Sequence, residues 1–177
     1  MPKMDICRHF NEKEMDLTNQ TLDRAVSLTR DYCDIDPKDW KDMKFELKSL
    51  KDLNKNEITD EAFAQLAQYR GVSSKASQGY RFNFYRICLQ DDKILNAVSE
   101  REDKTVLKPL LLYVVTHELI HIVRFNKLQK SFNSSWIEKE IEEKSAHQDT
   151  YHILKNTDVF GMDHVLDHYK NYRVTDG

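Results

Sequence analysis

VVTHELIHIV, residues 114–123, places two histidines and a glutamate inside the most apolar segment of the chain. Apolar residues continue on both sides of it, so residues 105–125 predict one long helix that is buried nearly all round. Burying a polar group without a partner costs roughly 2–7 kcal/mol. His117, Glu118 and His121 therefore need partners inside the protein, and the nature of those partners should indicate its chemistry.

The spacing of the two histidines is typical of metal ligands. His117 and His121 are four residues apart, so their side chains lie one turn apart on the same face of a helix. Two imidazoles in this arrangement can bind one metal ion at about 2.0–2.1 Å. Glu118 lies about 100° round the helix from His117, where it cannot easily bind the same ion but can reach a water molecule bound to it.

His117-Glu118-x-x-His121, set in an uncharged helix, resembles the active-site helix of the zincin metallopeptidases. The resemblance covers the ten residues 114–123. It implies a Zn²⁺ cofactor, a peptide or protein substrate, and hydrolysis of peptide bonds. It also implies that Glu118 takes a proton from the metal-bound water and later gives it to the leaving amine.

A catalytic zinc ion takes three protein ligands, so a third ligand is needed beyond the histidine pair. One zincin subgroup continues the motif with a glycine and a histidine, but Arg124 and Lys127 occupy those positions here, which excludes that subgroup. The gluzincins instead take a glutamate from a second helix further along the chain. The candidates in this chain are Glu138, Glu140, Glu142 and Glu143.

Helical phase separates these four glutamates. Measured against the mean direction of the apolar residues in 136–154, Glu143 and Glu140 point inward, whereas Glu138 and Glu142 point outward. Glu143 also opens a Glu-x-x-Ala pattern that gluzincins share, so we expect it to be the third ligand, with Glu140 as the second choice. His147 stands where gluzincins often carry an aspartate, and we expect an active-site role for it as a supporting partner, a transition-state donor or a ligand.

Two further observations concern the remaining candidates for the site. His164 and His168 repeat the four-residue spacing but lie in a polar segment, so an exposed helix face is expected for them. One of these histidines, or Tyr151, could supply a hydrogen-bond donor to a developing oxyanion.

The rest of the chain indicates an α+β fold with a small, mostly antiparallel sheet packed against several helices. Helices are predicted at residues 15–32, 59–70, 105–125, 135–155 and 162–172, and strands at residues 45–50 and 80–89. Gly71 stands where the second helix should stop, and residues 90–104 form a polar, mixed segment. By analogy with zincins, the strand at 80–89 or the strand at 45–50 should be an edge strand that pairs with the substrate backbone.

Composition limits the other possibilities. The 177 residues suit a single domain, and a net charge of −3 without a basic block gives no reason to expect nucleic acid. No signal peptide or membrane-spanning run is visible, and Cys7, Cys33 and Cys88 form no disulfide framework, so we expect a cytoplasmic protein without a membrane partner.

Two other functions compete with the peptidase. The chain could be a metallopeptidase-like regulatory or binding protein with very narrow or no proteolytic activity. It could also be a protein with a structural zinc ion, but such sites are usually closed by cysteines, and none of the three lies near the motif. The substrate and the oligomeric state have no signature in the sequence.

Overall fold

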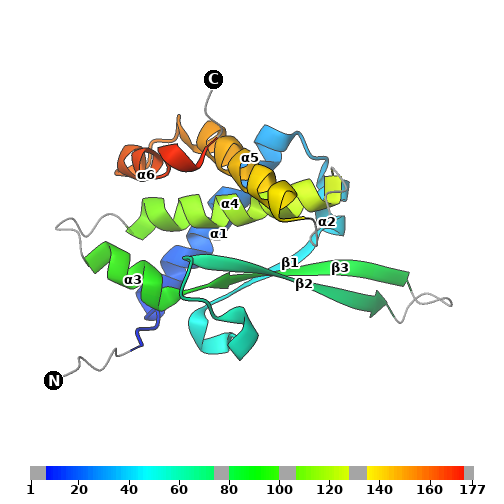
Figure 1. Ribbon diagram of the computed structural model, residues 1–177, viewed down its shortest axis with the longest axis horizontal. Helices are drawn as coiled ribbons and strands as arrows, with labels where there is room; N and C mark the ends of the chain where they lie inside the picture. Colours follow the sequence, from blue (N-terminus) through cyan, green and yellow to red (C-terminus); the bar gives the residue numbers. More distant parts are fainter. Residues whose placement is uncertain (1–6, 74–79, 100–106, 128–134, 174–177) are drawn as a thin grey trace.

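The computed structural model describes residues 7–73, 80–99, 107–127 and 135–173, and it has an α+β architecture. Figure 1 shows a small sheet with the longer helices gathered on one side of it. In chain order the elements are α1 (Glu12–Cys33), α2 (Pro37–Asp42), β1 (Lys44–Lys48), η1 (Leu50–Asp52), η2 (Lys55–Glu57), β2 (Ala64–Ser73), β3 (Tyr80–Leu89), α3 (Asp91–Ser99), α4 (Leu107–Lys127), α5 (Trp136–Leu154), α6 (Met162–His168) and η4 (Lys170–Tyr172). The predicted fold class is confirmed.

The sheet has the strand order β1-β3-β2. β2 and β3 pair antiparallel from Ala64↔Leu89 to Ser73↔Tyr80, whereas β1 pairs parallel with β3 over the shorter stretch from Lys44↔Phe84 to Lys48↔Cys88. The sheet is therefore mixed, and most of its pairing is antiparallel. Tyr85, Ile87 and Leu89 point from β3 into the core, as the period of two along a strand requires.

Helix α4 is the centre of the core. Every residue from Pro109 to Val123 is buried, because α1, α5 and α6 pack against the helix and the sheet covers another side. Fifteen successive positions without an exposed face match the apolar pattern of the sequence. Among the described residues, none of the helices is long and apolar enough to cross a membrane.

Side-chain caps define where the flanking helices begin. The Asn11 side chain accepts a hydrogen bond from the Glu14 backbone N–H, and the Glu14 side chain accepts one from the Asn11 backbone N–H, which forms a capping box at the start of α1. Ser135 and Glu138 form the same reciprocal pair at the start of α5. These caps fix the first turn of each helix that packs on α4.

Two predictions about secondary structure were wrong. Residues 59–70, which were expected to form a helix, instead form an irregular segment followed by most of strand β2. Ala64 to Arg70 pair with β3 and so do not form helical turns. Gly71 is not a helix stop: it faces Phe82 on β3, whose ring occupies the space that a Cβ would need. The polar segment at 90–104 contains helix α3, of which residues 91–99 are described.

The predicted edge strand also needs correction. β3 is hydrogen-bonded on both sides, so the strand at Tyr80–Leu89 has no free edge for a substrate. Among the described residues, the free edges belong to β1 and β2, so the alternative strand at 45–50 does lie at an edge, as β1. Neither β1 nor β3 lines the cleft described below, which is lined instead by the chain that leads into β2.

Candidate metal centre

His117 and His121 bring their Nε2 atoms together on one face of α4. The two atoms are 3.1 Å apart, and both side chains are at least nine-tenths buried. The four-residue spacing places the rings one turn apart, and the rings meet edge to face with centroids 4.6 Å apart. The helix therefore presents two nitrogen donors to one point.

Helix α5 supplies a carboxylate at that point. Glu143 Oε1 lies 3.0 Å from His117 Nε2, and Glu143 Oε2 lies 2.9 Å from His121 Nε2. In a tetrahedral site with zinc–ligand bonds of 2.0–2.1 Å, neighbouring donor atoms are about 3.3–3.4 Å apart. The observed separations are slightly shorter than that, so a small outward movement would make room for an ion, and the donor set of two imidazoles and one carboxylate is one that zinc accepts.

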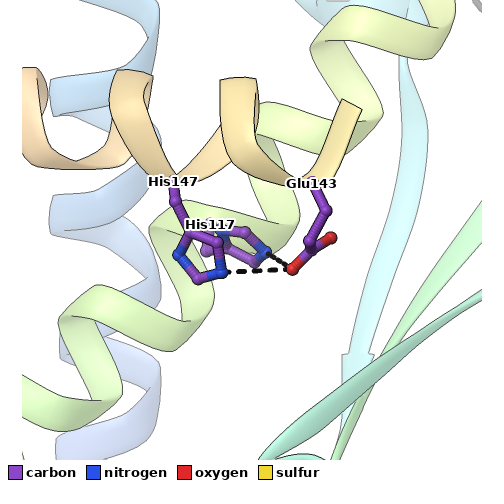
Figure 2. A group of neighbouring side chains, drawn as sticks. All are labelled: His117, Glu143 and His147. Carbon is purple, nitrogen blue, oxygen red and sulfur yellow. Dashed lines mark hydrogen bonds and ion pairs between the residues drawn. The ribbon is translucent and has the colours of Figure 1, made fainter. Parts of the chain in front are cut away.

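His147, one turn after Glu143 on α5, also approaches the carboxylate. Its Nε2 lies 3.2 Å from Glu143 Oε1, and its Nδ1 lies 2.7 Å from the hydroxyl of Tyr113 on α4. Figure 2 shows Glu143 beside the stacked rings of His117 and His147, with a dashed line from its carboxylate to each ring. An ionised carboxylate can only accept, so we assign the hydrogen of the neutral His147 ring to Nε2, and Tyr113 then donates to Nδ1.

A second set of three donors is therefore conceivable. One ligand atom each from His117, Glu143 and His147 lies within 4.8 Å of the others. The atoms of His117, His121 and Glu143 are closer to one another, at 2.9–3.1 Å, and Nδ1 of His147 is already bonded to Tyr113. We therefore favour the set with His121 and regard His147 as a hydrogen-bond donor.

Two of the three donors, His117 and Glu143, line a cleft of about 400 Å³; His121 is not among its lining residues, but its Nε2 lies 3.1 Å from that of His117. Glu118, which is 8% exposed, lines the cleft beside His117, Glu143 and His147. The other walls come from α3, α4, the chain that leads into β2, and the segment around η4: Asp60, Glu61, Ala62, Phe63, Ala64, Lys93, Tyr113, Val114, Tyr169 and Tyr172. A small molecule or a segment of peptide can therefore reach the carboxylate of Glu118 and the donor atoms together.

Burial and neighbouring carboxylates act in opposite directions on the pKa values of His117 and His121. Burial lowers the pKa of His117 to about 4, so its ring is neutral at pH 7 and keeps a lone pair for a metal. Burial acts in the same direction on His121, but the hydrogen bond to Glu143 and the nearby carboxylates outweigh it and raise the pKa of that ring.

The pKa values of the two carboxylates, Glu143 and Glu118, shift in opposite directions. For Glu143 burial opposes ionisation, but hydrogen bonds from His117, His121 and His147 outweigh it and hold its pKa well below the usual range. Burial raises the pKa of Glu118 to about 7 in the metal-free protein. One carboxylate is therefore fixed as an anion, whereas the other can gain or lose a proton near neutral pH.

The structure brings together His117, Glu118, His121, Glu143 and His147, the five residues selected from the sequence. Glu140 is not among them: its side chain is about half exposed and pairs with Lys144 at 3.5 Å.

The helical phase used to rank the glutamates was wrong for Glu142, which points inward and is buried against Arg124. The error arose because the apolar direction included Trp136, Ile137 and Ile141, and these are 76%, 64% and 60% exposed. Glu143 and His147 kept an inward direction in spite of that error, since they lie close to the buried Ala146.

Sequence reasoning missed Tyr113, although its position four residues before His117 on the same helix face was a usable signal. The cleft lining does not include Tyr151, His164 or His168 among the described residues. Both of those histidines are exposed on α6, as expected.

No protein-family model, curated protein or solved structure matches this chain. The site is therefore interpreted from its own geometry.

Proposed function

We propose that this chain is a metal-dependent peptidase in which His117, His121 and Glu143 hold a divalent ion, zinc being the one that suits them best. One observation carries the proposal: three donor atoms from two helices converge within 2.9–3.1 Å at a cleft that Glu118 also lines.

The ion would supply Lewis-acid chemistry: it polarises a carbonyl group and lowers the pKa of water. The chain's own residues do the rest. Glu118 accepts a proton from the attacking water as the C–O bond forms, and it gives the proton to the amine nitrogen as the C–N bond breaks. His147, held by Tyr113, directs an N–H group into the cleft and can donate it to the oxygen that gains negative charge.

A peptide substrate is supported by the position of β2. Its outer edge has no partner strand among the described residues, and Phe63 and Ala64 at its start line the cleft. An extended peptide can add to such an edge through backbone hydrogen bonds, which would place a peptide bond next to Glu118.

A closed structural site is less consistent with the geometry. The Glu143 side chain is 51% exposed and faces the cleft, whereas structural zinc sites are usually enclosed by four protein ligands. The metallopeptidase-like binding protein remains the competing proposal, and it differs from the peptidase in one measurable respect, the cleavage of peptide bonds.

Glu118→Gln tests the proposal. Zinc-loaded wild type and variant are incubated with a proteome-derived peptide library and with casein, and new termini are quantified by mass spectrometry. We expect cleavage by the wild type and a loss of about 10²–10⁴-fold in the variant, because the proton acceptor is gone while the ligands remain. Glu140→Gln, an exposed change on α5, is the control and should keep activity.

Equal zinc content in the three proteins must accompany that result. Cleavage that survives in Glu118→Gln would contradict the assigned mechanism. Zinc-loaded wild type that cleaves no peptide would favour the binding protein.

A further inference from the structure

Glu142 places a buried carboxylate beside the second ring nitrogen of His121. Its Oε1 lies 3.9 Å from His121 Nδ1, and both side chains are about nine-tenths buried. Glu142 stands one residue before Glu143, and the two neighbouring glutamates therefore approach the same imidazole from its two nitrogens, since Glu143 contacts Nε2 at 2.9 Å.

The Nδ1 atom of His121 lacks a partner. It is fully buried and accepts or donates no hydrogen bond within the described chain. When a metal takes Nε2 of a neutral histidine, the hydrogen must be on Nδ1, and it then needs an acceptor. The carboxylate of Glu142 lies about 1 Å beyond hydrogen-bond distance, so a small rotation of either side chain closes the gap.

Arg124 explains why a charged Glu142 is stable in this position. The guanidinium donates from Nε to Oε1 at 2.6 Å and from Nη2 to Oε2 at 3.2 Å, which is a two-point contact. Its Nη1 donates to Asp149 at 3.1 Å and so fixes the plane of the guanidinium. A carboxylate oxygen can accept two hydrogen bonds, and Oε1 therefore has a free lone pair next to His121.

We propose that Glu142 is a positioning residue of the metal site, which accepts a hydrogen bond from His121 Nδ1. Its role is to fix the tautomer and plane of the His121 ring, which makes the ring a stronger ligand. This inference rests on the proposed metal centre. It distinguishes His121 from His117, whose Nδ1 is also buried without a partner and has no carboxylate within ion-pair distance among the described residues.

The test compares two variants that break the same ion pair from opposite sides. Glu142→Gln removes the carboxylate, whereas Arg124→Gln removes the guanidinium and keeps the carboxylate beside His121. Zinc affinity is measured by competition with a chelating dye, and the stability of the metal-free proteins by urea unfolding. We expect zinc affinity to fall about 10–100-fold in Glu142→Gln and at most about threefold in Arg124→Gln, while stability falls in both. Equal loss of zinc affinity in the two variants would show that Glu142 only joins the helices, and would overturn the inference.

A measurement on the zinc-loaded wild type is independent of whether the variants fold. Histidine ¹⁵N-labelled protein should show a hydrogen on His121 Nδ1 that exchanges slowly with solvent and resonates far downfield, as a hydrogen bond to a carboxylate requires. A His121 ring whose Nδ1 hydrogen exchanges freely would overturn the inference while leaving the metal centre intact. Wild type that binds no zinc would overturn the metal centre and this inference with it.

Discussion

At the scale of single residues, the carboxylate of Glu143 places the hydrogen of His147 on Nε2, and the hydroxyl of Tyr113 donates to the other ring nitrogen, Nδ1. The hydroxyl lies 2.7 Å from His147 Nδ1, and Tyr113 is 1% exposed. The orientation of His147 therefore depends in part on Tyr113, a residue that takes no direct part in metal binding.

Tyr113→Phe should therefore leave a buried nitrogen without its donor. We expect the variant to lose about 1–3 kcal/mol of stability, the usual consequence of an unmet buried hydrogen bond. Its zinc affinity should stay within about threefold of the wild type, well short of the 10–100-fold change seen when a ligand loses its support. Urea unfolding and dye competition measure the two quantities. A large loss of zinc affinity would mean that His147 is a metal ligand after all.

Particular residues show how much of the site was predictable. His117, Glu118 and His121 follow from spacing alone, because a helix fixes which side chains share a face. The choice of Glu143 required an estimate of which face of α5 points into the protein. That estimate was only partly right, because Trp136, Ile137 and Ile141 are exposed although they are apolar. Tyr113 had a usable signal in its spacing of four residues from His117, whereas the roles of Arg124 and Glu142 depend on how α4 and α5 meet.

At the scale of elements, the packing of α5 on α4 determines where Glu143 lies. Ala146 is fully buried, one turn from Glu143 and next to His147. A small residue at that position lets the two helices approach closely enough for a carboxylate to contact both histidines.

Ala146→Leu should separate the helices. We expect a loss of about 1–3 kcal/mol in stability from overpacking, together with weaker zinc binding as Glu143 moves away from His117 and His121. Lys144→Leu adds a side chain of the same kind at an exposed position of α5 and is the matched control. Urea unfolding and zinc titration of both variants measure the effect. Unchanged zinc affinity in Ala146→Leu would contradict a site that depends on close helix packing.

The elements also show where sequence patterns fail. α1, β3, α4 and α5 have strong periodicity or long apolar runs, and all four lie within a few residues of their predicted bounds. Residues 59–70, which include most of β2, were predicted as a helix because Ala62, Phe63, Leu66 and Ala67 share one helical face. Pairing with β3 along the whole length of β2 overrides that local pattern, and such a distant contact has no local signature.

At the scale of the whole molecule, Glu57 connects segments that lie far apart in the sequence. It is 1% exposed, accepts hydrogen bonds from Tyr69 on β2 at 2.6 Å and from Arg86 on β3 at 2.9 Å, and belongs to η2. Burial alone would raise its pKa, but hydrogen bonds from Tyr69, the backbone of Asn54 and Arg86 outweigh it and lower the pKa. This carboxylate is therefore expected to stabilise the fold only while it is ionised.

The direction of this pKa shift determines how the stability of the protein depends on pH. The pKa of Glu57 is lower in the folded than in the unfolded protein, so its contribution is present above about pH 4.5 and is lost as the pH falls through the folded-state value. We expect Glu57→Gln to be less stable than the wild type by about 3 kcal/mol at pH 7, and the difference to shrink below pH 4.5. Urea unfolding at several pH values measures it, with Asp60→Asn as an exposed control. A difference that does not change with pH would contradict the assignment.

The zinc content of the purified protein tests the central claim most directly. Elemental mass spectrometry on wild type, Glu143→Ala, Glu140→Ala and His147→Ala should find about one zinc ion per chain in the wild type. The ion should remain in Glu140→Ala and His147→Ala and be lost or strongly reduced in Glu143→Ala, because only that variant lacks a donor of the favoured set. A wild-type protein that contains no zinc and takes none up, or a loss confined to His147→Ala, would contradict the metal centre as described.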